Sequence, residues 1–429
     1  MVAVPPVDNP LIGHLIDGAD KAAAAGRHGE AQRLLAEAKA AAPEHPRVLS
    51  ALGLYALKSG DFPAARRYLD EAVAADPRSA SLWFHLALAC RAQGDAGAEL
   101  MALDKSLALD AESYLALLQK ASLLERQGKP KQAAQVYVYF LHCVPPPAQR
   151  PPALQKAVQQ AQEAVAADKA ALGEFIRERI AHARTQHAGA RQDRFEHCLE
   201  VLLGRRRVFT PQPTFMHFPH LPAIEFYDRE DFPWLDEFEA ATDAIRDELL
   251  QVLAQGSEAQ EIVPYVDYPD GVPPEQWREL NRSLQWGAYY LIKDGVRLNS
   301  HLACCPKTAA LLDAAPLADV PDQAPTAFFS LLKPRTRIPP HTGVTNTRLV
   351  VHVPLVIPPG CGFRVGAETR EWQPGRAWVF DDTIEHEAWN ESDAPRAILI
   401  IDIWNPFLTE AERALVRAAT VAAADFKRE

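Results

Sequence analysis

Two histidines in the C-terminal half of the chain are candidate metal ligands. His341 lies in the segment Pro340–Gly343, and His386 ends the segment Asp381–His386. Arg396 follows ten residues after His386. Imidazole nitrogens bind iron, and a guanidinium group can hold a carboxylate through two parallel hydrogen bonds. These residue types predict one iron site that works with a 2-oxoacid cosubstrate.

The residues around the two histidines alternate in the way that β-strands do. Successive strand residues point to opposite faces of a sheet. In Arg348–Leu355 one face is aliphatic, and the other carries Arg348, Val350 and His352. A second strand, which begins at Arg396, has a face made of Arg396, Ile398, Ile400 and Asp402. Two histidines, Ser330 and Arg396 on neighbouring strands, at the mouth of one barrel, indicate a binding site.

Short alternating runs interrupted by Pro and Gly fill Ser330–Pro406. This pattern of short alternating runs is typical of a small β-barrel or jelly roll. From about residue 208 onward, Pro, aromatic residues and strand-like runs replace Ala-rich helical sequence. We therefore predict that residues 208–429 form a β-rich domain.

The N-terminal part of the chain repeats with a period of 34 residues. Gly26, Gly60, Gly94 and Gly128 share this spacing. The period and the recurring small residues resemble tetratricopeptide repeats, about four of them over residues 12–145, stacked as an all-α solenoid. The match to the pattern is weakest at Glu99, where the pattern prefers Ala. Such an array usually offers a groove for a peptide or protein, and the alternative is a rigid platform with no ligand of its own.

A Pro-rich segment, Val144–Pro152, marks a boundary after the repeats. The residues from about 153 to 205 are predicted to form two helices. We assign 146–207 as a helical cap and linker between the solenoid and the β-rich domain, because an open end of the array would expose apolar side chains.

The composition disfavours several classes of partner. The formal net charge is −11 over 429 residues, which disfavours nucleic acid and a basic membrane-binding surface. The sequence has neither a signal-peptide pattern at its start nor a run of about 18 apolar residues. The six cysteines lack CxxC spacing and are expected to be reduced thiols. A cytoplasmic protein is the resulting expectation.

Residues from about 208 to 406 resemble the aspartyl/asparaginyl β-hydroxylases. The motifs that carry the resemblance are His341–Gly343, Thr345–Leu349, Phe380–Glu387, Arg396 and Asp402–Pro406. The resemblance implies a double-stranded β-helix (jelly-roll) fold and an oxygenase that uses Fe(II), 2-oxoglutarate and O2. Tetratricopeptide repeats also precede this catalytic domain in animal members of the family.

The resemblance also implies roles for individual residues. His341 and His386 would bind the iron and so be catalytic. In most iron sites of this kind, a carboxylate two residues after the first histidine completes the set of metal ligands. This chain has Gly343 at that position. The family that it resembles also lacks this carboxylate, and water is thought to take its place on the metal. The 2-oxoglutarate would be held by Ser330 and Arg396, with His352 nearby. Arg348 would contact cosubstrate or substrate.

Asp381 and Asp382 precede His386 by five and four residues. Either one could reach the metal directly, or support the water bound to it, and the sequence favours the supporting role.

The function implied is β-hydroxylation of Asp or Asn residues in a peptide or protein recruited by the repeats. One alternative keeps the oxygenase chemistry and changes the substrate to a free or carrier-bound amino acid or a lipid acyl chain. Another is a non-catalytic repeat scaffold. Val350 bears on the choice of substrate, since animal members have a second Arg at that position.

Overall fold

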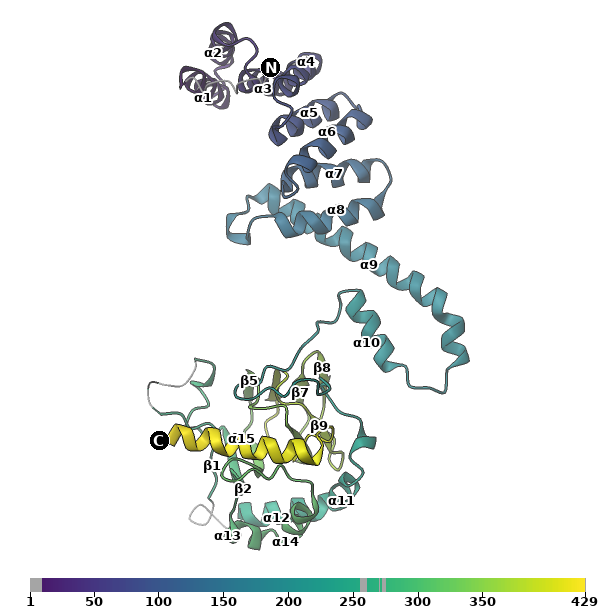
Figure 1. The fold of residues 1–429 in the computed structure, drawn as a ribbon, viewed down its shortest axis with the longest axis vertical. Coiled ribbons are helices and arrows are strands. Elements are labelled where there is room, and N and C mark those ends of the chain that lie inside the picture. Colours follow the sequence, from purple (N-terminus) through teal and green to yellow (C-terminus); the bar gives the residue numbers. More distant parts are fainter. Residues whose placement is uncertain (1–9, 255–260, 270, 272–274, 429) are drawn as a thin grey trace. The chain divides into compact units, whose positions relative to one another are not determined.

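The computed structural model describes residues 10–254, 261–269, 271 and 275–428. The chain divides into two compact units, Met1–Leu203 and Gly204–Glu429 (Figure 1). Each unit has its own hydrophobic clusters. The prediction of a helical repeat solenoid followed by a β-rich domain is confirmed.

The first unit consists of paired antiparallel helices. The helices are α1 (Pro10–Ala24), α2 (His28–Ala41), α3 (Pro46–Lys58), α4 (Phe62–Ala75), α5 (Ala80–Ala92), α6 (Ala96–Leu109), α7 (Tyr114–Arg126), α8 (Pro130–Cys143), η1 (Pro147–Gln149), α9 (Pro152–Gln186) and α10 (Asp193–Leu202). Each of the four repeated glycines follows the first helix of a pair with φ between 71° and 82°. Glycine adopts this left-handed conformation without the steric cost that a Cβ would bring, so the period of 34 residues marks the turns.

Small residues set the spacing between paired helices. A Cβ added at Gly53 would lie 2.5 Å from Leu69 Cγ, so α3 and α4 approach too closely for a larger residue. Val158 and Ala161, on the first turns of α9, join the apolar cluster of α7 and α8. The long helix therefore covers the end of the fourth pair.

Glu99 departs from the small-residue pattern because the structure provides partners for it. Its side chain on α6 is buried, and Arg126 Nη2 on α7 donates hydrogen bonds to both carboxylate oxygens, at 2.8 and 2.7 Å. Gln119 Nε2 donates a third, at 2.9 Å. A buried carboxylate is tolerated when it is paired and hydrogen-bonded in this way.

The second unit contains two antiparallel sheets. The seven-stranded sheet has the order β1 (Val263–Pro264), β2 (Trp286–Lys293), β4 (Ala327–Leu332), β11 (Arg396–Trp404), β6 (Arg348–Val356) and β9 (Trp378–Phe380), with β3 (Val296–Arg297) paired to β2. The four-stranded sheet has the order β5 (Thr336–His341), β10 (His386–Asn390), β7 (Cys361–Val365) and β8 (Glu368–Arg370). From β4 to β11 the chain moves back and forth between the sheets, which is the strand order expected of a double-stranded β-helix.

The second unit also contains helices, some of which cover the outer face of the larger sheet. They are η2 (Arg229–Asp231), α11 (Leu235–Ala240), α12 (Thr242–Ala254), η3 (Glu275–Trp277), α13 (Asn299–Cys304), α14 (Pro306–Ala314) and α15 (Glu410–Arg428). Of these, α11, α12 and α14 pack with the aliphatic faces of β6 and β11, and α11 to α14 gather on one side of the unit in Figure 1. None of the helices in the described part of the chain is long and apolar enough to cross a membrane.

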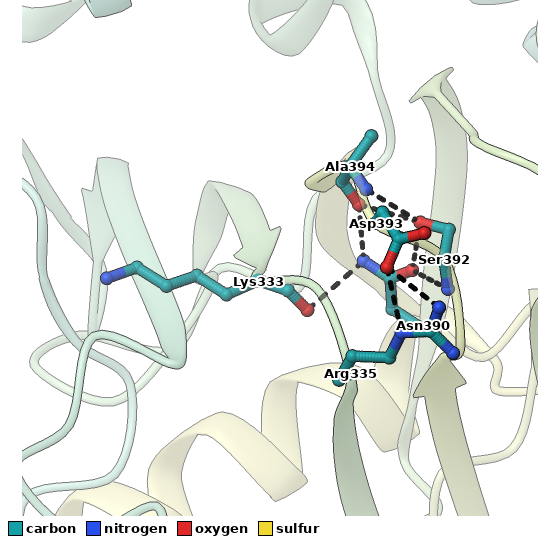
Figure 2. A network of polar contacts seen from close by, with 6 residues as sticks. All are labelled: Lys333, Arg335, Asn390, Ser392, Asp393 and Ala394. Atoms are coloured by element: carbon teal, nitrogen blue, oxygen red, sulfur yellow. Dashed lines mark hydrogen bonds and ion pairs between the residues drawn. The ribbon is translucent and has the colours of Figure 1, made fainter.

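A polar turn ties β10 to β11 (Figure 2). The side-chain amide of Asn390 donates hydrogen bonds to three backbone carbonyls, those of Leu332, Lys333 and Ala394. Ser392 Oγ donates to Asn390 Oδ1 at 2.6 Å, and Arg335 pairs with Asp393 at 2.7 Å. Because Leu332 ends β4, these bonds fix the ends of three strands together. The turn thereby sets the position of Arg396 relative to the strand that begins at His386.

Candidate metal and cosubstrate site

A cavity of about 960 Å³ lies between the two sheets of the second unit. Alternate residues of β6 and β11 face it, as strand periodicity predicts: Arg348, Val350 and His352 from β6, and Arg396, Ile398, Ile400 and Asp402 from β11. The residues between them pack outward against the helices. All six residues predicted for the site line this one cavity, including Ser330 from β4, His341 from β5 and His386 from β10.

His341 and His386 face each other across two hydrogen-bonded strands. They are register partners in the β5–β10 ladder, and their ring centroids are 4.0 Å apart. His341 is the last residue of β5 and His386 is the first residue of β10. Both therefore lie at the same end of this antiparallel pair in the smaller sheet. The register alone brings together two residues that are 45 positions apart in the chain.

Backbone carbonyls orient both imidazole rings. Nδ1 of His341 lies 2.8 Å from the carbonyl oxygen of Pro339, and Nδ1 of His386 lies 3.0 Å from that of Ile384. A carbonyl can only accept, so each Nδ1 carries the proton and each Nε2 keeps a free lone pair. Burial lowers the pKa of His341, and burial together with His341 holds the pKa of His386 well below its ordinary value. Both rings are therefore neutral donors.

Asp382 occupies the space that a side chain at position 343 would need. A Cβ added to Gly343 would lie 2.0 Å from Asp382 Oδ2. The amide of Gly343 also donates a hydrogen bond to the carbonyl oxygen of Asp382 at 2.7 Å. The carboxylate missing after the first histidine is thus replaced in space by one from the segment before the second histidine.

The two adjacent carboxylates have different surroundings. Asp381 Oδ1 accepts hydrogen bonds from the backbone nitrogen and the hydroxyl of Thr383, at 2.9 and 2.6 Å. Asp382 lines the cavity and Asp381 does not, while Asp381 Oδ2 and Asp382 Oδ1 are both buried without a hydrogen-bond partner. Burial, with Asp381 and Asp402 nearby, raises the pKa of Asp382 to about 7 despite the opposing charge of Arg348. Asp382 is therefore the carboxylate placed to act inside the cavity.

Arg396 is a buried cation at the other end of the cavity. Only 1% of it is exposed, and its Nη1 donates to the carbonyl oxygen and the hydroxyl of Ser330, each at 3.2 Å. Its Nε is buried without a partner, and burial lowers its pKa to about 10. A buried guanidinium with no carboxylate partner is costly in free energy unless an anion completes the site.

Two tryptophans that sequence reasoning missed complete this end of the cavity. Trp286 Nε1 donates to Ser330 Oγ at 3.0 Å. Trp372 lies beneath the Arg396 guanidinium, 5.0 Å from ring centroid to Cζ, and its Nε1 donates to His352 Nδ1 at 3.4 Å. Burial and Arg396 hold the pKa of His352 well below its ordinary value, so its ring is neutral. No spacing in the sequence signals these contacts, because both tryptophans reach the site from other strands and loops.

Arg348 lies away from Arg396 and has a partner of its own. Its Nη1 donates to Asp402 Oδ2 at 2.9 Å, across the β6–β11 pair. Asp402 Oδ2 also accepts a hydrogen bond from the backbone nitrogen of Thr326 at 3.0 Å. The side chain predicted to contact cosubstrate or substrate is therefore ion-paired through Nη1, while its Nε is buried without a hydrogen-bond partner.

The residues present fit Fe(II) and a 2-oxoacid. Among the described residues, no group of three or more His, Cys, Asp and Glu side chains is arranged to hold a metal ion. Two neutral imidazoles with free Nε2 lone pairs suit Fe(II) and would leave other coordination positions open. The unpartnered Nε of Arg396 fits the distal carboxylate of the cosubstrate.

Comparisons with known proteins agree with the motifs. Residues 239–406 match the sequence model of the aspartyl/asparaginyl beta-hydroxylase family, and residues 50–113 match that of a tetratricopeptide repeat. The resemblance found in the sequence is confirmed for these two regions.

Several relatives match part of the chain. An ornithine lipid ester-linked acyl 2-hydroxylase of Rhizobium tropici is 32% identical over 188 residues, which cover 43% of this chain and 62% of that protein. Human aspartyl/asparaginyl beta-hydroxylase is 38% identical over 129 residues, which cover 30% of this chain and 17% of that protein. The chain thus spans less than two thirds of the length of these relatives. Among solved structures, MamA aligns with 41% of this chain and 95% of its own at 20% identity and a TM-score of 0.31.

Proposed function

We propose that this chain, which carries an aspartyl/asparaginyl β-hydroxylase domain and tetratricopeptide repeats, is an Fe(II)- and 2-oxoglutarate-dependent dioxygenase. The observation that carries the proposal is the shared cavity. Two neutral imidazoles oriented by carbonyls and a buried arginine without a carboxylate partner line the same space. The cavity therefore contains both the imidazoles that can bind a metal ion and the arginine that can bind an anion.

Each residue has a separate task in this proposal. His341 and His386 hold Fe(II) through Nε2. Arg396 and Ser330 bind the distal carboxylate of 2-oxoglutarate, and Trp286 keeps the Ser330 hydroxyl oriented. Burial and the charge of Arg396 lower the pKa of His352, so that the neutral ring can pack beside the cosubstrate without repelling the cation.

The aromatic walls and Asp382 control the surroundings of the metal. Phe363 and Phe380 lie beside the His386 ring, with centroids 6.0 and 5.5 Å away, and limit access of water. Asp382, whose carboxylate lies beside Gly343, would accept a hydrogen bond from a metal-bound water. Bound Fe(II) supplies the activation of O2, which the side chains alone lack. One oxygen atom enters a substrate C–H bond and the other enters succinate, while 2-oxoglutarate loses CO2.

The substrate predicted from the sequence is an Asp or Asn residue of a peptide or protein that the repeats recruit. A second candidate is an acyl chain or another non-protein substrate, which the apolar residue Val350 favours. The absence of nucleic-acid and membrane partners and a cytoplasmic location remain predictions from the composition.

Replacing the two histidines tests the metal assignment. We expect His341→Ala and His386→Ala, singly and together, to lower Fe(II) affinity by about 100-fold or more, since loss of even a supporting group typically costs 10–100-fold. Succinate release from 2-oxoglutarate should fall to background in the double variant. Metal content after equilibrium dialysis and succinate by mass spectrometry are the measurements.

His142→Ala is the matched control, because His142 is exposed on α8 and bonds only to its own helix. Full iron binding and succinate release by the double variant would rule out the assignment of both histidines.

A further inference from the structure

Trp372 contacts two polar residues at the cosubstrate end of the cavity. It lies between β8 and β9, lines the cavity and is only 4% exposed. The Arg396 guanidinium lies over its ring, with Cζ 5.0 Å from the centroid. Its Nε1 lies 3.4 Å from Nδ1 of His352. One buried side chain therefore acts on both the cation and the imidazole at this end.

The hydrogen bond from Trp372 determines which nitrogen of His352 carries a proton. An indole N–H can only donate, so Nδ1 of His352 accepts with its lone pair. A ring whose Nδ1 is unprotonated is neutral and carries its proton on Nε2. This neutral state agrees with the low pKa that burial and the charge of Arg396 give to His352. The Nε2–H group is therefore the only hydrogen-bond donor of the ring.

This tautomer is opposite to that of the two candidate metal ligands. Backbone carbonyls place the proton of His341 and His386 on Nδ1, and this leaves Nε2 free for a metal ion. In His352 the proton occupies Nε2, which therefore cannot bind a metal ion but can donate to a carboxylate. The partner of Nδ1, a carbonyl in one case and an indole in the other, thus separates the two roles.

Trp372 also stabilises the Arg396 cation without neutralising it. A guanidinium over the face of an indole is attracted by the electron density of the ring. This contact needs no carboxylate, and within the described part of the chain the buried Nε of Arg396 has no hydrogen-bond partner. The Nε–H group therefore stays available for a carboxylate of the cosubstrate.

From this geometry we propose that Trp372 is a positioning residue for the cosubstrate: it holds His352 as the Nε2–H tautomer, and this N–H group donates to a carboxylate of the 2-oxoacid. The proposal rests on the proposed oxygenase function and adds a residue to it. Packing alone would be satisfied by phenylalanine, because Phe363 and Trp378 contact Trp372 by ring stacking. The indole N–H is the group that a phenyl ring lacks.

Nitrogen chemical shifts of the metal-free full chain test the tautomer. The protein is isotope-labelled at its histidine nitrogens, and the signals of His352 are identified by their loss in His352→Asn. We expect an unprotonated Nδ1 and a protonated Nε2 for His352, and the reverse for His341 and His386. A proton on Nδ1 of His352 would overturn the proposal.

Replacing Trp372 tests the effect on the cosubstrate. Trp372→Phe removes the N–H and keeps an aromatic face under Arg396. We expect the Kd of 2-oxoglutarate, measured by calorimetry on the Mn(II)-loaded protein, to rise about tenfold, because a hydrogen bond to a charged group loses its fixed donor. The KM for 2-oxoglutarate of the Fe(II)-loaded protein should rise to the same extent, while kcat changes less than about twofold. The affinity for Fe(II) should stay as in wild type.

Trp378→Phe is the matched control. Trp378 stacks in the same aromatic cluster, and among the described residues it is not part of the cavity lining and its buried Nε1 has no hydrogen-bond partner. Its replacement should leave the Kd and the His352 tautomer as in wild type. Equal increases in Kd for Trp372→Phe and Trp378→Phe would show that Trp372 only packs, and would overturn its positioning role.

Two substitutions of His352 separate the donor from the ring. The longer side chain of His352→Gln can bring an amide N–H to the place of Nε2–H, and that of His352→Asn is one carbon shorter. We expect His352→Asn to raise the Kd about tenfold and His352→Gln to recover most of this loss. Adding Trp372→Phe to His352→Asn should cause no further loss, because both changes act through one hydrogen bond. A further tenfold loss would contradict the proposal.

Failure of the oxygenase function gives a different result from failure of this proposal. Wild-type protein that releases no succinate and binds no 2-oxoglutarate would count against the oxygenase itself. Wild-type protein that turns over, while the two tryptophan variants behave alike, would count against the role of Trp372 alone.

Discussion

At the scale of single residues, Asp382 is the most constrained group in the site. Its carboxylate fills the space beside Gly343, and its Oδ1 is buried without a hydrogen-bond partner. Burying a carboxylate favours its protonated form, which explains a pKa of about 7 where 3.8 is ordinary. The metal-free protein therefore holds a proton here that the unfolded chain would release.

That proton makes stability depend on pH. A carboxyl group whose pKa is raised by folding stabilises the fold fully below pH 3.8, and the contribution is lost as the pH rises through 7. Between pH 4 and 7.5, the unfolding free energy of metal-free wild type should therefore fall relative to Asp382→Asn, by up to about 4 kcal/mol. Denaturant unfolding of both proteins across this range measures the difference. Parallel pH profiles would show that Asp382 titrates normally.

Residue types predicted the site only in part. His341, His386, Ser330 and Arg396 carry chemistry that can be recognised in sequence, and the structure brings them to one cavity. The sequence left Asp381 and Asp382 as alternatives, because adjacent residues in a short segment can each point either way. The structure distinguishes the two residues because Thr383 donates its hydrogen bonds to Asp381 and not to Asp382.

At the scale of elements, the two long strands β6 and β11 carry most of the site. Their alternation was readable from the sequence, because an aliphatic face must be buried while the other face is free for polar side chains. The pairing of Arg348 with Asp402 was not readable, since it depends on the register between strands that are far apart in the chain. Trp286 and Trp372 escaped prediction for the same reason.

The contact between the histidine-bearing segments can be tested through Gly343. Its φ lies outside the left-handed region, so an added Cβ would cost free energy only through its clash with Asp382. We expect Gly343→Ala to lower the unfolding free energy by about 1–3 kcal/mol. Asp382→Gly in the same chain should recover most of this loss by removing the clashing carboxylate.

A double-mutant cycle on the metal-free protein measures the coupling. Additive effects of Gly343→Ala and Asp382→Gly would show that the two residues do not compete for one space.

At the scale of the whole molecule, the chain combines two units with separate cores. The period of 34 residues predicted the helical unit because each repeat contacts mainly its neighbours, so local sequence is sufficient. For the second unit, the sequence predicted a β-rich fold class and the motifs that carry the site residues. Its two-sheet strand order depends on contacts between distant segments, which local patterns leave undetermined.

Separate cores predict separate unfolding. Calorimetry of the full chain should show two transitions. Gly53→Ala, which would place a Cβ 2.5 Å from Leu69 Cγ, should lower only one of them. Gly343→Ala should lower only the other. For units of this size, each kcal/mol lost shifts a transition by about 2–4 °C. A single transition that both variants lower equally would contradict independent cores.

The buried pair of Glu99 and Arg126 also limits how the solenoid can evolve. Repeat arrays lengthen and shorten when whole repeats are duplicated or deleted, because one repeat can usually stand beside any other. Here α6 depends on two side chains of α7, and loss of the unit formed by α7 and α8 would leave a buried carboxylate without its counter-ion. Such a loss costs about 3–5 kcal/mol. This junction should therefore be inherited intact, while other parts of the array are freer to gain or lose repeats.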